Sequence, residues 1–247
     1  MNKKKSNFTT ILTWTIVSIL LIISLLIIWL ARSPQQVNDM LQKATSGLKN
    51  YALIVHIIFI STFFTGIFLR KIRNIIFPLL MIFISISAVV AAVLYKILPN
   101  IVIYGLYAVL ITVSHIKKEF DFDFKKKSWL SYVFGILGIV MGFWYLHWVE
   151  KPILINALFF SPLGIVNCPT MLVVCGILIF NSNTKLYLLE SVVGLSTLWI
   201  GFMGIFALEA YIDIILIITA LFILIRLGYN LSYNSLIKIE NHNENNF

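Results

Sequence analysis

The chain has 247 residues, of which 60% are hydrophobic and only 12% are charged, with a formal net charge of +9. A water-soluble domain carries about a quarter charged residues, so the composition excludes one and predicts an integral membrane protein. The apolar runs are unbroken, which excludes a β-barrel, and the basic residues lie in short loops between them, which excludes a nucleic-acid-binding face.

Charge-free stretches predict a single domain over residues 1–231, an all-α bundle of about eight transmembrane helices. The first of these helices is predicted to be a retained signal anchor. A polar, Asn-rich tail over 232–247 is predicted to be disordered. The expected helices cover residues 9–31, 51–69, 74–95, 98–116, 129–149, 152–181, 186–207 and 210–226.

The distribution of Lys and Arg predicts the orientation of these helices. With both termini in the cytoplasm, most of the 19 basic residues fall in cytoplasmic segments, as the positive-inside rule requires. The lipid bilayer is therefore expected as the surroundings of the protein, with no nucleic-acid partner.

Two loops carry further signals. Ser33-Pro34-Gln35-Gln36 has an N-cap, a proline at the first helical position and a capping box, which predicts a short amphipathic helix over 34–47 on the outer membrane surface. The stretch Lys117–Lys127 mixes charges with phenylalanines. It is expected to be a solvated cytoplasmic loop that dips its aromatic rings into the membrane interface.

The sixth predicted helix is too long for one straight crossing and contains Pro162, Gly164 and Pro169. Because these residues weaken a helix, we expect a helix over about 152–161, an unwound stretch, and a second helix over about 169–181. Transporters build binding sites at such breaks. One alternative is a sealed kink with its carbonyls satisfied by neighbouring groups, and another is a segment that re-enters the membrane.

Three polar residues at this break are candidate binding groups: Asn167, Cys168 and Thr170. Cys168 is expected as the N-cap of the second half-helix and Pro169 at its first position. Cys168 and Cys175 are spaced seven apart, which suits neither a disulfide nor a Cys-x-x-Cys metal site. The sequence contains no catalytic motif that we can identify and predicts no cofactor.

Glu190 lies about one turn inside the seventh predicted helix and is a candidate ion or proton carrier, because an intramembrane carboxylate is costly and often functional. The alternative is that Glu190 reaches back to Lys185 and cytoplasmic water. Glu209 and Asp213, in the outer hairpin that follows, are expected to be exposed.

Two rows of small residues predict close helix packing, or an interface with a second copy or another membrane protein. They are Gly135, Gly138 and Gly142 in the fifth helix, and Gly194, Thr197, Gly201 and Gly204 in the seventh.

Aromatic and histidine residues give the remaining candidates. Trp144, Tyr145, His147 and Trp148 predict an aromatic belt at the outer end of the fifth helix. His56, about two turns into the second helix, is a candidate binding residue. It would be a haem ligand if a second histidine came near it.

The Asn167-Cys168-Pro169-Thr170 element and the apolar helix after it resemble a family of bacterial multi-pass membrane proteins of unknown function. That family has a Pro-Cys-Pro-Thr element opening an apolar helix, and Asn167 stands here in place of the first proline. The resemblance covers residues 129–226. It implies a bacterial inner-membrane setting and an important role for the element.

Three functions remain from the sequence. The leading hypothesis is a small-molecule or ion transporter with its site at the sixth-helix break. The alternatives are a membrane redox, haem or metal-binding subunit that uses the histidines, and a structural or accessory subunit of a membrane complex, held by the glycine rows.

Overall fold

Residues 33–149, 153–183 and 185–244 are described by the computed structural model, and this part of the chain is helical without strands. Five segments are long and apolar enough to cross a membrane, so the protein is a multi-pass α-helical membrane protein. They are α3 (Lys49–Phe68), α4 (Arg73–Leu94), α5 (Leu98–Ile116), α9 (Tyr187–Ala207) and the first part of α10 (Ile214–Glu244).

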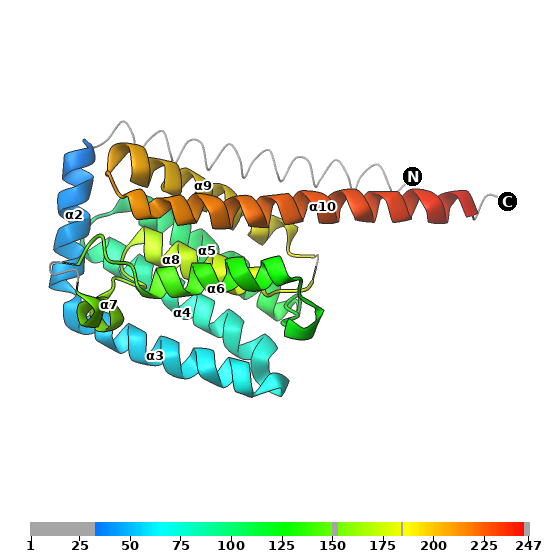
Figure 1. The fold of residues 1–247 in the computed structure, drawn as a ribbon, viewed down its shortest axis with the longest axis horizontal. Coiled ribbons are helices and arrows are strands. Elements are labelled where there is room, and N and C mark those ends of the chain that lie inside the picture. Colours follow the sequence, from blue (N-terminus) through cyan, green and yellow to red (C-terminus); the bar gives the residue numbers. More distant parts are fainter. Residues whose placement is uncertain (1–32, 150–152, 184, 245–247) are drawn as a thin grey trace.

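Shorter elements complete the fold (Figure 1). Two apolar helices, α6 (Trp129–Phe143) and α8 (Asn167–Ile179), lie among the long ones. The others are α2 (Pro34–Gly47), α7 (Leu154–Phe160) and the 3-10 turns η1 (Arg70–Ile72), η2 (Phe124–Lys126) and η3 (Tyr211–Asp213). The predicted first helix, 9–31, lies outside the described residues.

Helix α2 forms at the predicted residues and for the predicted local reason. The Ser33 hydroxyl accepts from the Gln36 amide, and the Gln36 side chain accepts from the Ser33 amide, so the capping box is complete. The helix runs across one end of the bundle, at a steep angle to the long helices (Figure 1), and buries Leu41 and Ala44 against it. We refer to this end of the molecule as the α2 end.

The opposite end collects the loops that contain residues 69–72, 117–128 and 180–186, and we refer to it as the basic end. The Arg73 guanidinium donates to the Phe122 carbonyl at 3.2 Å, and the Asp121 amide donates to Asn181 Oδ1 at 2.8 Å. Loop 117–127 therefore packs into the bundle. Phe122 is buried against Phe77, so the predicted solvated loop with its rings in the membrane interface is wrong for this side chain.

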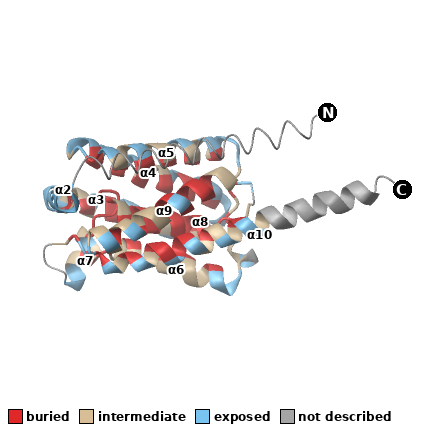
Figure 2. Ribbon diagram, turned by 90° about the horizontal axis from the view of Figure 1, so that it is seen from above, coloured by how far each residue is buried: buried red, intermediate tan, exposed pale blue. Residues whose placement is uncertain are grey.

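Helix α8 lies at the centre of the bundle, and every residue from Cys168 to Ile179 is buried (Figure 2). It packs on α4, α6, α9 and α10. Glycines allow the close contact with α6, because a Cβ at Gly142 would lie 2.6 Å from the Pro169 carbonyl oxygen and one at Gly138 would lie 2.9 Å from the Leu172 carbonyl oxygen.

The glycine row of α9 is also covered within the chain. A Cβ at Gly194 would lie 2.8 Å from Leu224, and one at Gly201 would lie 2.8 Å from Ile217, both on α10. Both rows thus pack helices of one chain together and are not free for a second copy.

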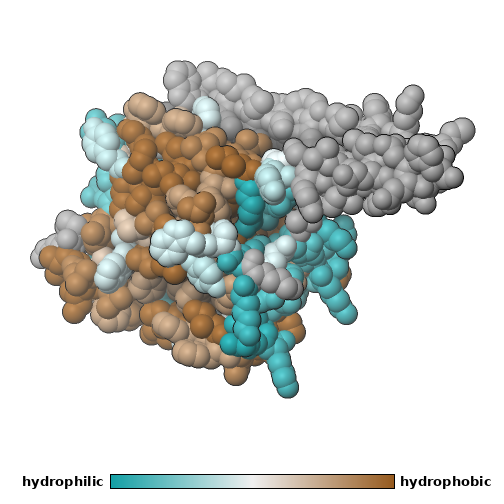
Figure 3. Space-filling model, turned by 45° about the vertical axis from the view of Figure 1, so that its right-hand side comes forward, coloured by the Kyte–Doolittle hydropathy of each residue, from teal (hydrophilic) through white to brown (hydrophobic). Residues whose placement is uncertain are grey.

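Large apolar side chains face outward along the long helices, as lipid contact requires. They include Phe68, Val102, Ile116, Phe206 and Ile225. Figure 3 shows the hydrophobic surface on the sides of the bundle and hydrophilic residues gathered toward one end.

Two predicted boundaries differ from the structure. The fifth helix ends at Phe143 instead of reaching 149, because the chain turns there to bring Tyr145 into the core. Helix α10 continues to Glu244, where the sequence led us to expect a disordered tail; adding residues to a helix that has already formed costs little.

Candidate functional site

The sixth predicted helix is broken, as its prolines and glycine suggest. Helix α7 ends at Phe160, six non-helical residues follow, and α8 begins at Asn167. Gly164 has φ +70°, a backbone conformation that favours glycine. The N-cap of α8 is Val166, so Cys168 and Pro169 lie inside the first turn and not at the predicted N-cap and first position. Proline is tolerated there because first-turn amides need no partner within the helix.

The backbone of the break is fully buried, and neighbouring groups satisfy it. The Gly164 amide donates to Thr170 Oγ1 at 2.9 Å, and the Gly164 carbonyl accepts from Ser87 Oγ at 2.6 Å. Thr170 Oγ1 also donates to the Val166 carbonyl, and Tyr51 donates to Ser87 Oγ. In this conformation the break is closed to solvent.

A buried carboxylate lies beside the break. Asp213 Oδ1 accepts from the Tyr145 hydroxyl at 2.5 Å, and its Oδ2 accepts from the Cys168 thiol at 3.0 Å. Both Asp213 and Tyr145 are 0% exposed. The predictions of an exposed Asp213 and of an interfacial Tyr145 in an aromatic belt are therefore wrong. We call these three residues the Asp213 cluster.

Three distant segments build the Asp213 cluster. Tyr145 follows α6, Cys168 lies in the first turn of α8, and Asp213 ends η3. Space for the carboxylate comes from Gly204 of α9, where a Cβ would lie 1.7 Å from Asp213 Oδ2. One signal in the sequence points to this burial: Asp213 falls within the apolar stretch 210–226 that predicts the eighth helix.

Asn167 lies in the same first turn of α8. Its backbone carbonyl accepts from the Tyr104 hydroxyl at 2.7 Å, while its side-chain Oδ1 is buried without a hydrogen-bond partner. The structure therefore joins the predicted residue Cys168 to Asp213, and through Asp213 to Tyr145, neither of which the sequence indicated as a site residue. Thr170 bonds instead to the Gly164 amide and the Val166 carbonyl.

Glu190 is at the opposite, basic end. It forms a 2.7 Å ion pair with Arg226 and is buried. The same guanidinium donates to the carbonyls of Ile179 and Leu178 at the last turn of α8. The sequence predicted Glu190 either as an ion or proton carrier or as a side chain that reaches back to Lys185, and neither prediction describes this arrangement. Glu190 and its partner stabilise the end of α8 and do not face the break.

Lys127 lies beside this ion pair in the loop before α6 and donates to the Asn181 carbonyl. Burial, together with the Arg226 guanidinium, lowers the pKa of Lys127 to about 8, while Glu190, Asp121 and Asp123 act in the opposite direction. This group of charges belongs to the packing of the basic end.

His56 is buried on α3. Its Nδ1 lies 2.7 Å from the Ala52 carbonyl oxygen, and its ring meets the Phe143 ring edge-on at 4.6 Å. Within the described residues, no three His, Cys, Asp or Glu side chains come close enough together to hold a metal ion.

No family model matches this chain, and no curated protein and no solved structure matches it. The chemistry of the Asp213 cluster is therefore argued from its own geometry.

Proposed function

We propose that the protein is a secondary transporter of the bacterial inner membrane, in which Asp213 carries a proton or a small cation. The supporting observation is the Asp213 carboxylate itself. Its two hydrogen-bond partners are neutral donors, and within the described residues no cationic side chain forms an ion pair with it.

A carboxylate buried in this way is costly, and binding a proton or a cation offsets that cost. One acceptor in the cluster and one in the same turn of α8 suit a positively charged species. Asn167 Oδ1 is an unpartnered acceptor in the same turn as Cys168, and the Tyr145 oxygen keeps lone pairs after donating its proton. The position beside a broken helix agrees with the way transporters bind ions.

The proposal includes eight crossings with both termini in the cytoplasm. Support comes from the grouping of loops: the basic end holds the loops after α3, α5 and α8, and the α2 end holds those after α4, α6 and α9. The sixth segment begins at the α2 end, where Phe160 lies against Lys49, and finishes at the basic end, where Asn181 meets Asp121. This favours a full crossing over re-entry.

A transporter must open the break to water at some stage, although this conformation is closed. The test is labelling of Cys168 in intact cells with a membrane-impermeant maleimide, in a Cys175→Ser background. We expect slow labelling of the native protein, because Cys168 is exposed only in a minor, open state. Lys96→Cys in a chain lacking Cys168 and Cys175 measures the rate for an exposed thiol.

The second candidate is a structural or accessory subunit, favoured by the complete burial of residues 161–166 and their internal hydrogen bonds. Labelling of Cys168 only after denaturation would mean that the break never opens. The transport proposal would then be abandoned in favour of this candidate.

A further inference from the structure

A proton and a metal cation make different demands on the groups around Asp213. A proton adds to one oxygen atom and needs no further ligand, whereas hard cations such as Mg²⁺ and Ca²⁺ take about six oxygen ligands or more. Within the described residues, the carboxylate is hydrogen-bonded to the Tyr145 hydroxyl and the Cys168 thiol. Sulfur is a soft ligand that hard cations do not favour. The Asp213 cluster is therefore short of ligands for a metal cation.

The broken helix does not supply the missing ligands. Transporters coordinate Na⁺ with backbone carbonyl groups that an unwound helix exposes. Here the carbonyls of Pro162, Gly164 and Val166 already accept hydrogen bonds from within the chain. The Gly204 carbonyl on α9, beside the carboxylate, accepts from the Ala210 amide. Each of these four oxygens would have to share or lose a hydrogen bond in order to bind a cation.

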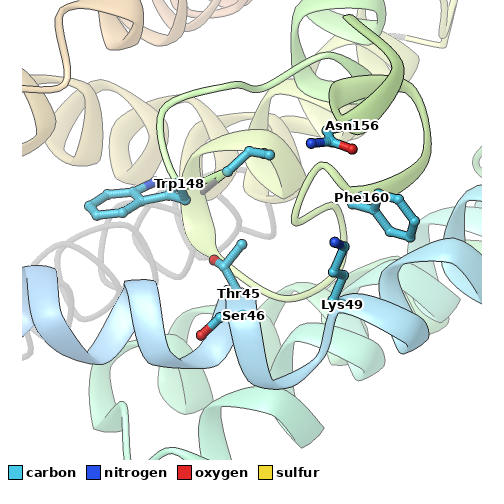
Figure 4. A pocket seen from close by; sticks show the side chains of 7 residues that line it. Thr45, Ser46, Lys49, Trp148, Asn156 and Phe160 are labelled. Carbon is cyan, nitrogen blue, oxygen red and sulfur yellow. The ribbon is translucent and has the colours of Figure 1, made fainter. Parts of the chain in front are cut away.

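The space around the carboxylate also favours a proton. Asp213 is 0% exposed, and a Cβ at Gly204 would lie 1.7 Å from Oδ2, so the backbone of α9 lies directly against this oxygen. A cavity of about 150 Å³ at the α2 end (Figure 4) has room for about five water molecules. Its described lining shares no residue with the Asp213 cluster and includes Lys49, whose positive charge disfavours a cation there. A proton needs no cavity.

Few titratable groups face Asp213. Among the described residues they are Tyr145, which follows α6, and Cys168 of α8. The neighbouring helices bring no others close, because α9 has no titratable residue after Glu190 and α10 has none before Arg226. A change in the protonation of Asp213 is therefore felt first by these two hydrogen-bond partners.

The two partners differ in a way that favours protonation at Oδ2. The Tyr145 phenol is the stronger donor, whereas the Cys168 thiol is a weak donor and also a weak acceptor. When a proton adds to Oδ2, the new O–H donates to the Cys168 sulfur, and the thiol hydrogen rotates about the Cβ–Sγ bond away from the carboxyl group. The Tyr145 hydrogen bond to Oδ1 is kept. Protonation at Oδ1 would instead disrupt the stronger of the two hydrogen bonds.

We propose that the species carried by Asp213 is a proton bound at Oδ2, and that Cys168 reverses its hydrogen bond when this proton is bound or released. The step adds one H⁺ to the carboxylate and needs no other reactant. This assignment rests on the proposed transport function, since it names the species that the same site carries. Tyr211, two residues earlier in η3, is 72% exposed, so the proton has only a short distance to travel from the surface at the α2 end.

The S–H stretching band of Cys168 in the infrared spectrum tests the reversal, because its frequency depends on the hydrogen bond that the thiol donates. In the full chain with Cys175→Ser, Cys168 is the only thiol. Spectra are compared between mildly alkaline and mildly acidic pH, and then at constant alkaline pH with Na⁺, K⁺, Mg²⁺ or Ca²⁺ replacing choline at equal ionic strength. Cys168→Ser is the matched control, because the remaining thiol, Cys175, lies beside Thr197 instead of a carboxylate.

We expect acidic pH to shift the Cys168 band to higher frequency, because the thiol loses its charged acceptor. Asp213→Asn in the same background should abolish this shift, and the Cys175 band of the control should not move. None of the four cations should move either band. A shift of the control band equal to that of Cys168 would mean a general change in the protein and would overturn the reversal.

The other outcomes separate this inference from the transport function. A shift of the Cys168 band with one of the cations at constant pH would overturn the proton and leave transport of that cation. A band that responds neither to pH nor to any cation would overturn Asp213 as the binding site. Maleimide labelling of the same Cys175→Ser chain reports the opening of the break separately. A pH-dependent shift in a chain whose Cys168 never labels would keep the proton site and remove transport.

Discussion

Asp213 shows how a single residue can depend on the whole bundle. A carboxylate in an apolar interior is stabilised only if its oxygens find donors, and here the Tyr145 hydroxyl and the Cys168 thiol supply one each. Removing either donor leaves one oxygen without a partner. The three side chains should therefore behave as one energetic unit.

A double-mutant cycle tests this unit. Tyr145→Phe removes the donor of the 2.5 Å hydrogen bond and Asp213→Asn removes the charge of its acceptor, so we expect a coupling energy between about 0.5 and 3 kcal/mol in the free energy of unfolding. Unfolding by SDS in mixed micelles measures it. The control is Tyr132→Phe, whose hydroxyl donates to the Phe124 carbonyl at the basic end, and its effect should add to that of Asp213→Asn. Additivity in both cycles would contradict a coupled cluster.

At the scale of residues, a contact between neighbours in the sequence could be predicted. A contact between residues far apart in the sequence could not. The Ser33 cap depends on a residue three positions away, and it formed as predicted. Glu190 pairs with Arg226, 36 positions away, and Asp213 is buried because Gly204 and Tyr145 arrive from other segments. The spacing of these residues in the sequence does not predict these contacts, because the contacts follow from tertiary packing.

At the scale of elements, the contact between α6 and α8 depends on glycine more than on side-chain interlocking. The backbones approach so closely that Gly135, Gly138, Gly142 and Gly176 leave no room for a methyl group. Close approach of this kind gives helices in lipid their van der Waals contact. The row in the fifth helix could be recognised in the sequence, but its partner helix could not.

Gly142→Ala should destabilise the protein, because its Cβ would lie 2.6 Å from the Pro169 carbonyl oxygen. Overpacking of this kind costs about 1–3 kcal/mol. Gly105→Ala in α5 is the matched control, since a Cβ there meets nothing within 4 Å, and it should stabilise the helix by up to about 1 kcal/mol. Midpoints of thermal unfolding compare the two variants. An unfolding midpoint for Gly142→Ala equal to or above that for Gly105→Ala would contradict the close contact between α6 and α8.

At the scale of the whole molecule, hydropathy alone gives the approximate ranges of the five described segments that are long and apolar enough to span a bilayer. The central position of α8 could not be foreseen, because its apolar residues look the same whether they face lipid or protein. Lipid and core differ little in polarity, so a hydropathy pattern cannot separate them.

The orientation of the bundle gives a direct prediction. In a chain with both native cysteines replaced by serine, Lys96→Cys at the α2 end should react with an impermeant maleimide in intact cells. Lys71→Cys at the basic end should react only after the membrane is permeabilised, because the positive-inside rule assigns this end to the cytoplasm. The reverse pattern would contradict the orientation.

The enclosed position of α8 also has a consequence for biosynthesis. Two of the helices that surround it, α9 and α10, follow it in the chain, so the ribosome releases α8 before its complete surroundings exist. Its 13 residues span about 20 Å, which is too short to be held in the bilayer as an independent helix. The newly made chain therefore passes through a stage in which α8 has been synthesised but α9 and α10 do not yet cover it. Only the arrival of the last two helices fixes it in place.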